Sequence, residues 1–99
     1  MIVLSEIRRE GLPEPALQFT VEPSPGWKIR FDFAWPDKRA ALEVDHPFWH
    51  DGIEASGRDK HRDLHAGTAG WHTMRVTDLD VHGGLASSIS AVGRILAQR

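Results

Sequence analysis

A chain of 99 residues without cysteine has room for one hydrophobic core, and it can form neither disulfides nor thiolate zinc sites. Hydrophobic residues make up 40% of the chain and charged residues 26%, as in ordinary globular proteins, and the net charge of −2 is not that of a protein that coats nucleic acid. No segment approaches the roughly 18 apolar residues of a membrane span and no secretion signal is visible, so we expect a cytoplasmic protein.

Hydrophobic periodicity and turn residues predict a series of helices and strands. Val3 and Ile7 lie one helical turn apart, and Gly11 followed by Pro13 ends this first helix. The predicted elements are a helix over 2–10, strands over 16–22, 27–35 and 40–45, a loop over 47–57, a polar helix over 58–69, a strand over 71–77 and a helix over 85–98. This order predicts an α/β fold in which a mixed four-stranded sheet has helices on both faces.

The segment 27–35 is the clearest strand, because residue types alternate along it. We expect its odd-numbered residues to share one apolar face, and Lys28, Arg30 and Asp32 to share the other. The odd-numbered residues are Trp27, Ile29, Phe31, Phe33 and Trp35. The last helix has an apolar stripe at helical spacing, formed by Leu85, Ile89, Val92 and Leu96.

Potential metal ligands gather at the end of the third predicted strand, in the stretch ALEVDHPFWHDG. This stretch places Glu43, Asp45, His46, His50 and Asp51 close together in the chain. Such a cluster is either a solvated loop edge or one half of a metal site.

The turn between the second and third strands determines which residues face each other. With a four-residue turn, Asp32 lies opposite Glu43 and Arg30 lies opposite Asp45. Two carboxylates about 5 Å apart repel each other unless a cation lies between them. Two interpretations are open from spacing alone: a hard divalent metal such as Mg²⁺ or Mn²⁺ binds both acids, or Lys28 and Arg30 neutralise them at a sheet edge.

The segment RFDFAWPDKRAALEVD, from Arg30 to Asp45, resembles the core of the PD-(D/E)XK nucleases, the restriction-endonuclease-like superfamily. Within it, the chain is similar to a bacterial family of domains of unknown function related to very-short-patch-repair endonucleases. The similarity extends to GLPEP (11–15), DHPFWH (45–50), RDKHRD (58–63) and GWHTMRVTDLDV (70–81), so it covers nearly the whole chain.

This resemblance implies an αβββαβ core with an extra C-terminal helix, and hydrolysis of DNA phosphodiester bonds with Mg²⁺ or Mn²⁺. It implies that Asp32 and Glu43 are the metal-binding carboxylates, with the backbone carbonyl of Val44 as a further ligand. It also implies that residues 1–99 form a single endonuclease-like domain.

The chain departs from the superfamily pattern at two places. Asp45 stands where the superfamily has a lysine, although the closer family also carries an acid there. His50 and Lys60 are the candidates to replace that lysine in catalysis. The family's first helix also carries an acidic residue near its beginning, which here falls at or before Met1, with Glu6 more than one turn too late. We therefore expect a shortened first helix, and three explanations are open: a naturally short member, a truncated gene, or a domain cut from a longer protein that has an N-terminal domain outside this chain.

The histidines offer further candidates. His50 follows the acidic strand by one short loop, where it either transfers a proton during hydrolysis or packs beside Trp49. His61 and His65 have the i, i+4 spacing of zinc ligands, but the chain lacks an HExxH pattern, so surface positions are the favoured interpretation. Trp49, in the loop, is the tryptophan placed to stack on a nucleic acid.

The segment RDKHRD places Arg58 and Arg62 one helical turn apart. One interpretation is a face that contacts DNA phosphates. The other is a solvated helix joined by ion pairs, in which Arg62 and Asp63 bridge to the sheet.

The sequence thus predicts a metal-dependent DNA endonuclease. The alternatives are a catalytically inactive nuclease-fold module that binds DNA or a protein partner, and a structural domain that accompanies an N-terminal region. The full acidic geometry with bound Mg²⁺ or Mn²⁺ favours the enzyme, whereas splayed acids neutralised by Arg30 and Lys28 favour the alternatives.

Overall fold

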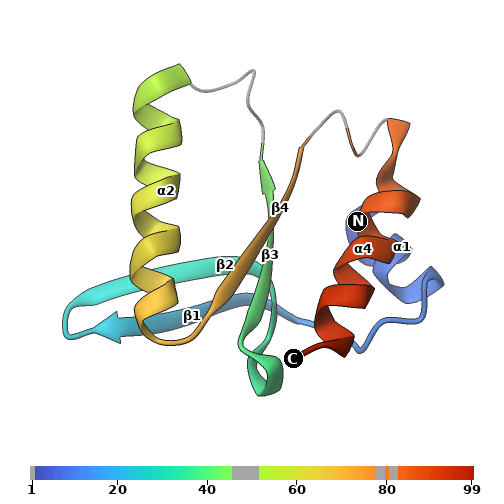
Figure 1. Cartoon of the computed structure of the whole chain (residues 1–99), viewed down its shortest axis with the longest axis horizontal. Coiled ribbons are helices and arrows are strands. Elements are labelled where there is room, and N and C mark those ends of the chain that lie inside the picture. The colour runs from blue at the N-terminus through green and yellow to red at the C-terminus, as the bar shows by residue number, and fades with distance from the viewer. Residues whose placement is uncertain (1, 46–51, 78–79, 81–82) are drawn as a thin grey trace.

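The computed structural model describes residues 2–45, 52–77, 80 and 83–99, with the backbone alone described over 52–59. Its elements are α1 (Ile2–Arg9), β1 (Ala16–Ser24), β2 (Trp27–Trp35), a 3₁₀ turn (Pro36–Lys38), β3 (Ala40–Asp45), α2 (Gly52–Thr68), β4 (His72–Thr77) and α4 (Leu85–Ala97) (Figure 1). The predicted α/β fold, with a mixed four-stranded sheet flanked by helices and a C-terminal helix, is confirmed.

The strands of the sheet lie in chain order, β1-β2-β3-β4. The β1–β2 and β2–β3 pairs are antiparallel, and the β3–β4 pair is parallel. Residues with positive φ shape both antiparallel connections, Gly26 at +80° and Arg39 at +49°. Because parallel neighbours require a crossover, the chain passes from β3 to β4 through α2 (Figure 1).

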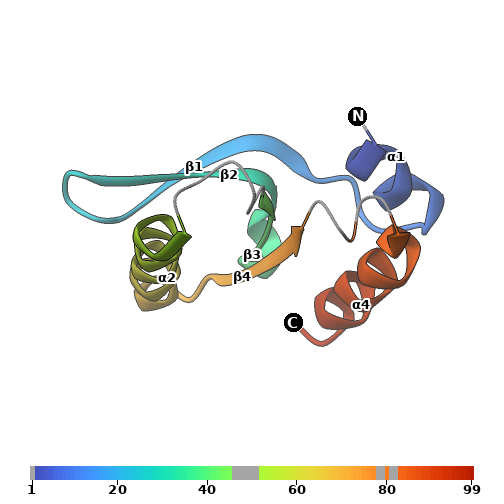
Figure 2. The same ribbon diagram turned by 90° about the horizontal axis from the view of Figure 1, so that it is seen from above.

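The large apolar core lies between the sheet and the pair of helices α1 and α4, whereas α2 lies over the other part of the sheet (Figure 2). The apolar stripe predicted for the last helix is confirmed, because all four of its residues are buried in this core. The buried core residues are Val3, Ile7, Phe33, Trp35, Ala40, Leu42, Met74, Val76, Leu85, Ile89, Val92 and Leu96. This core fixes the positions of β3 and β4, on which the candidate site is built.

Side chains of β2 contribute to two cores, so the expectation of a single apolar face was wrong. Ile29 and Phe31 pack in a smaller cluster with Ala66 of α2. Phe33 and Trp35 belong instead to the large core against α1 and α4. The large apolar side chains of β2 therefore point to one face of the sheet up to Phe31 and to the other face from Phe33 onward.

The change coincides with an irregularity at Asp32. The β1–β2 pairing is present on both sides of Asp32 but not at that residue, and Gln18, which faces it, has a φ of +52°. A left-handed residue within a strand disturbs the regular alternation of side chains. Asp32 thus lies where the pleat of the sheet is interrupted. The regular alternation of residue types along 27–35 gives no sign of this interruption.

Two elements, α2 and β1, have a bound that differs from its prediction by two residues or more. The helix predicted over 58–69 begins at Gly52. The prediction missed its first turns because that segment lacks apolar periodicity. The predicted loop over 47–57 is therefore wrong from 52 onward, and residues 46–51 are outside the described part of the chain. β1 extends to Ser24 through Pro23, which an edge strand tolerates. No helix within the described residues is long and apolar enough to cross a membrane.

Candidate functional site

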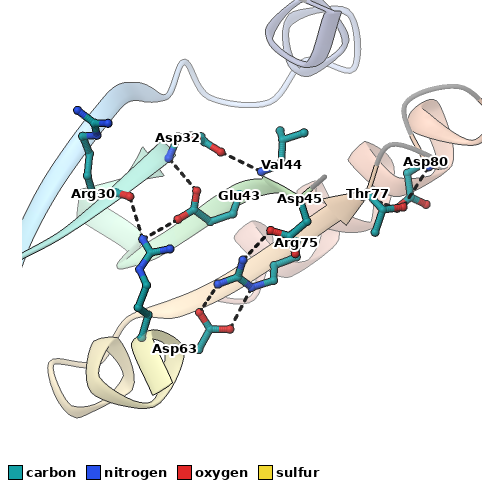
Figure 3. A network of polar contacts seen from close by, with 10 residues as sticks. Arg30, Asp32, Glu43, Val44, Asp45, Asp63, Arg75, Thr77 and Asp80 are labelled. Atoms are coloured by element: carbon teal, nitrogen blue, oxygen red, sulfur yellow. Dashed lines mark hydrogen bonds and ion pairs between the residues drawn. The ribbon is translucent and has the colours of Figure 1, made fainter. Parts of the chain in front are cut away.

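The candidate site lies where β2 and β3 separate (Figure 3). The predicted register is confirmed by the pairs Trp35↔Ala40, Ala34↔Ala41 and Phe33↔Leu42. The described pairing stops there, immediately before Asp32 and Glu43. The two acidic side chains therefore come together at the end of the β2–β3 ladder.

Each acid accepts a hydrogen bond from the backbone of the opposite strand. The Asp32 N–H donates to Glu43 Oε2 at 3.2 Å, and the Val44 N–H donates to Asp32 Oδ2 at 2.9 Å (Figure 3). The side chains thus satisfy backbone donors at the point where the strands separate. As the sequence predicted, Asp32 and Glu43 converge, and Val44 lies beside them.

Glu43 is the one charged residue among the buried side chains of the described structure, with 6% of its surface exposed. Burial, and then the adjacent Asp32 carboxyl, raise the pKa of Glu43 from its ordinary value of 4.5 to about 7, against the opposing effects of the Asp32 N–H and the Arg62 charge. A buried carboxyl whose pKa is shifted by a neighbouring carboxyl is typical of functional sites. It also indicates that an extra positive charge here would be favourable.

Arg62 of α2 is the cation that pairs with Glu43. Its Nη2 donates to Glu43 Oε1 at 3.1 Å and to the backbone carbonyl of Arg30 at 3.0 Å. The predicted bridge from this helix to the sheet is therefore present for Arg62. The side chains of Lys28 and Arg30, which were the other candidates to neutralise the acids, are exposed, and Arg30 points away from Glu43 (Figure 3).

Asp45 pairs with Arg75, not with Arg30 as the extrapolated register suggested. Arg75 Nη1 donates to Asp45 Oδ1 at 2.7 Å. The same guanidinium donates through Nε and Nη2 to the two carboxylate oxygens of Asp63, at 3.1 and 2.7 Å. Arg75 therefore joins β3 to α2, and Asp45 contributes to an ion-pair network.

Arg75 was not predicted as a site residue, although the alternation along its own strand indicates which way its side chain points. Met74 and Val76 are buried in the large core, so Arg75 between them projects to the opposite side of β4. The missing information was the parallel pairing that places Arg75 beside Glu43. Parallel register depends on a long crossover connection, and short-range sequence patterns do not define it.

The interface between α2 and the sheet around this site is a charged layer. Within the described residues it contains four carboxylates and two guanidinium groups, a formal charge of −2 when all are ionised. Its members are Asp32, Glu43, Asp45, Asp63, Arg62 and Arg75. We call this set the acidic layer. The charge of one divalent cation would neutralise it.

The remaining predicted residues are Lys60, His50, Trp49 and Arg58. Lys60 is exposed on α2. His50 and Trp49, and the side chain of Arg58, fall outside the described residues, so their predicted roles stay predictions.

His61 and His65 share one face of α2, as their spacing predicted. Their ring centroids are 4.6 Å apart, and the ring of His65 stacks on Trp27 at 4.2 Å. In the part of the chain that the structure describes, no group of three or more His, Cys, Asp or Glu residues is arranged to hold a metal. These two rings therefore pack in an aromatic cluster. Within the described residues, Asp32 and Glu43 are the only acids in direct contact at the strand ends.

Fold and site together define an α/β domain with a carboxylate pair at the divergence of two central strands. The chain is 39% identical, over 83 residues, to the uncharacterized protein MT2308 of Mycobacterium tuberculosis strain CDC 1551 / Oshkosh and to the uncharacterized protein Rv2248 of strain ATCC 25618 / H37Rv. The match includes 81% of this chain but spans only 31% of each relative. No protein-family model matches the chain, and no solved structure matches it.

Proposed function

We propose that the chain is a metal-dependent DNA endonuclease domain in which Asp32 and Glu43 bind Mg²⁺ or Mn²⁺. The observation that carries this proposal is the crowding of two carboxylates at the end of the β2–β3 ladder, with the pKa of the buried Glu43 raised to about 7. Proteins with carboxylates this close either protonate one of them or place a cation between them. The net charge of the acidic layer favours the cation.

The donor set fits a hard divalent ion. Carboxylate and carbonyl oxygens are the ligands that Mg²⁺ and Mn²⁺ prefer, and Asp32, Glu43 and the Val44 carbonyl would supply them. Each carboxylate oxygen has two lone pairs, so the hydrogen bonds from backbone N–H groups and Arg62 leave acceptor capacity. When bound, such an ion activates water and polarises the phosphate.

The residues of the chain would divide the remaining tasks. Asp32 and Glu43 are held by the backbone of the facing strand, so their carboxylates need little reorganisation to accept a ligand. Arg62 of α2 pairs with Glu43 and supplies a positive charge beside it. His50 would accept the proton of the attacking water, or Lys60 would orient that water or stabilise the phosphate in place of the missing lysine.

A second candidate is a nuclease-fold module that binds DNA or a protein without cleaving. The observation that favours it is the Arg62–Glu43 ion pair, which already provides one of the acids with a cation. The pairing of Arg75 with both Asp45 and Asp63 points the same way, because it joins α2 to the sheet without a metal. In this alternative the acidic layer is a structural network.

A cleavage assay separates the two candidates. Wild-type protein is incubated with supercoiled plasmid and with single-stranded DNA, in Mn²⁺, in Mg²⁺ and in EDTA. Glu43→Gln is the matched control, since it keeps the shape of the side chain and removes its charge. The proposal expects nicking that requires metal and is lost in Glu43→Gln, whereas DNA binding with no cleavage in any divalent metal supports the module.

A further inference from the structure

We propose that Arg62 is an internal counter-ion that competes with the divalent metal for Glu43 and thereby lowers the metal affinity of the site. This inference rests on the proposed metal site. It assigns Arg62 a regulatory role there, in place of the phosphate contact that the sequence left open. The role follows from what Arg62 contacts and from what else holds Glu43.

Arg62 occupies the position from which a cation stabilises Glu43. Its Nη2 is 3.1 Å from Glu43 Oε1, and the same nitrogen is 3.0 Å from the Arg30 carbonyl. The guanidinium is thus anchored to β2 and β3 together and lies against the acid that would bind the metal. Because both are cations, the charge of Arg62 and the charge of a metal on Glu43 oppose each other.

Glu43 does not depend on Arg62 for its position. Its other oxygen, Oε2, accepts the Asp32 N–H, and β3 is an inner strand paired to β2 and to β4. The side chain is also almost fully enclosed. Removal of Arg62 therefore takes away a charge more than it takes away an anchor.

The size of the effect follows from the exposure of the two partners. The Arg62 side chain is 33% exposed and the Glu43 side chain 8%, so solvent screens their electrostatic interaction in part. For a unit charge in contact with a metal ligand under these conditions, we expect metal affinity to change by about 10-fold. A residue with only a structural role would act in the opposite direction, since its loss would loosen the site and weaken binding.

The test is the affinity for Mn²⁺ alone, measured by electron paramagnetic resonance of free Mn²⁺ at constant ionic strength. Arg62→Gln removes the charge and Arg62→Lys keeps it. Arg94→Gln is the matched control, because it makes the same change in net charge at an exposed position of α4. Arg62→Met, which keeps the aliphatic stem, replaces Arg62→Gln if that variant does not fold by circular dichroism.

We expect Arg62→Gln to bind Mn²⁺ about 10-fold more tightly than wild type, and Arg62→Lys and Arg94→Gln to bind like wild type. Equal or weaker binding by Arg62→Gln overturns the inference. If wild type nevertheless cleaves DNA in a Glu43-dependent way, the proposed function stands and only the role of Arg62 fails. If no variant binds Mn²⁺ at millimolar concentration, the metal site and the role of Arg62 both fail.

Discussion

Replacing Glu43 with glutamine should change how stability depends on pH. The pKa of Glu43 is raised from 4.5 to about 7 in the folded protein, chiefly by burial and by the Asp32 carboxyl. The folded state therefore binds this proton more tightly than the unfolded state does. The contribution of Glu43 to the free energy of unfolding is fully present below about pH 4.5, and it is lost as pH rises through about 7.

The expected magnitude follows from the two pKa values. Each pKa unit corresponds to about 1.4 kcal/mol, so the free energy of unfolding of wild type should fall by about 2.5 kcal/mol between pH 5 and 8, relative to Glu43→Gln. That is a large part of the roughly 5–15 kcal/mol by which small domains are stable. Titrating groups remote from Glu43 are common to both proteins, so their effects cancel in the difference.

Urea unfolding followed by circular dichroism, at pH 5, 6, 7 and 8, measures this difference. Glu14→Gln is the control: the Glu14 carboxyl is exposed and the Arg8 hydrogen bond lowers its pKa, so its removal should leave the slope between pH 5 and 8 unchanged. Parallel stability curves for wild type and Glu43→Gln over this range would refute the reasoning. They would mean that Glu43 titrates in the folded protein as it does in the unfolded chain.

Three further results are expected. Mn²⁺ at ten times its Kd should stabilise wild type by about 1.4 kcal/mol and raise Tm by about 6–11 °C, and an equal shift in Asp32→Ala would show that the ion binds elsewhere. Arg75→Ala should lower the free energy of unfolding by about 2 kcal/mol in urea melts, because it leaves Asp45 and Asp63 without their shared cation; a change below about 0.5 kcal/mol would contradict this. His50→Ala should slow DNA cleavage by about 10²–10⁴-fold in single-turnover assays while Mn²⁺ affinity is kept, and wild-type rates would make His50 a packing residue.

The sequence predicted β2 and β3 to the residue, together with the register that joins them. Strong local features explain this success. Alternating aromatic and charged residues identify β2, and Pro36 at the following turn limits where the strand can end. With a short turn, the pairing of an antiparallel hairpin follows directly, and so does the convergence of Asp32 and Glu43.

The partners of these acids were less accessible to sequence reasoning. Arg62 was identified as a candidate, but its contact with Glu43 depends on how α2 packs on the sheet. Arg75 reaches Asp45 because β4 lies beside β3 in parallel, a pairing that no short turn defines. The interruption at Asp32 was hidden as well, because the left-handed residue opposite it is Gln18 and not the glycine that such a conformation usually requires.

The most direct test of the proposed metal site is a crystal structure of the protein soaked in Mn²⁺, with anomalous diffraction data collected to locate the ion. We expect an anomalous peak between Asp32 and Glu43, with oxygens of both carboxylates about 2–2.5 Å from it, the range for hard divalent ions. A well-ordered site with no peak at saturating Mn²⁺, and with Arg62 still on Glu43, would contradict the proposal that this carboxylate pair binds a catalytic metal.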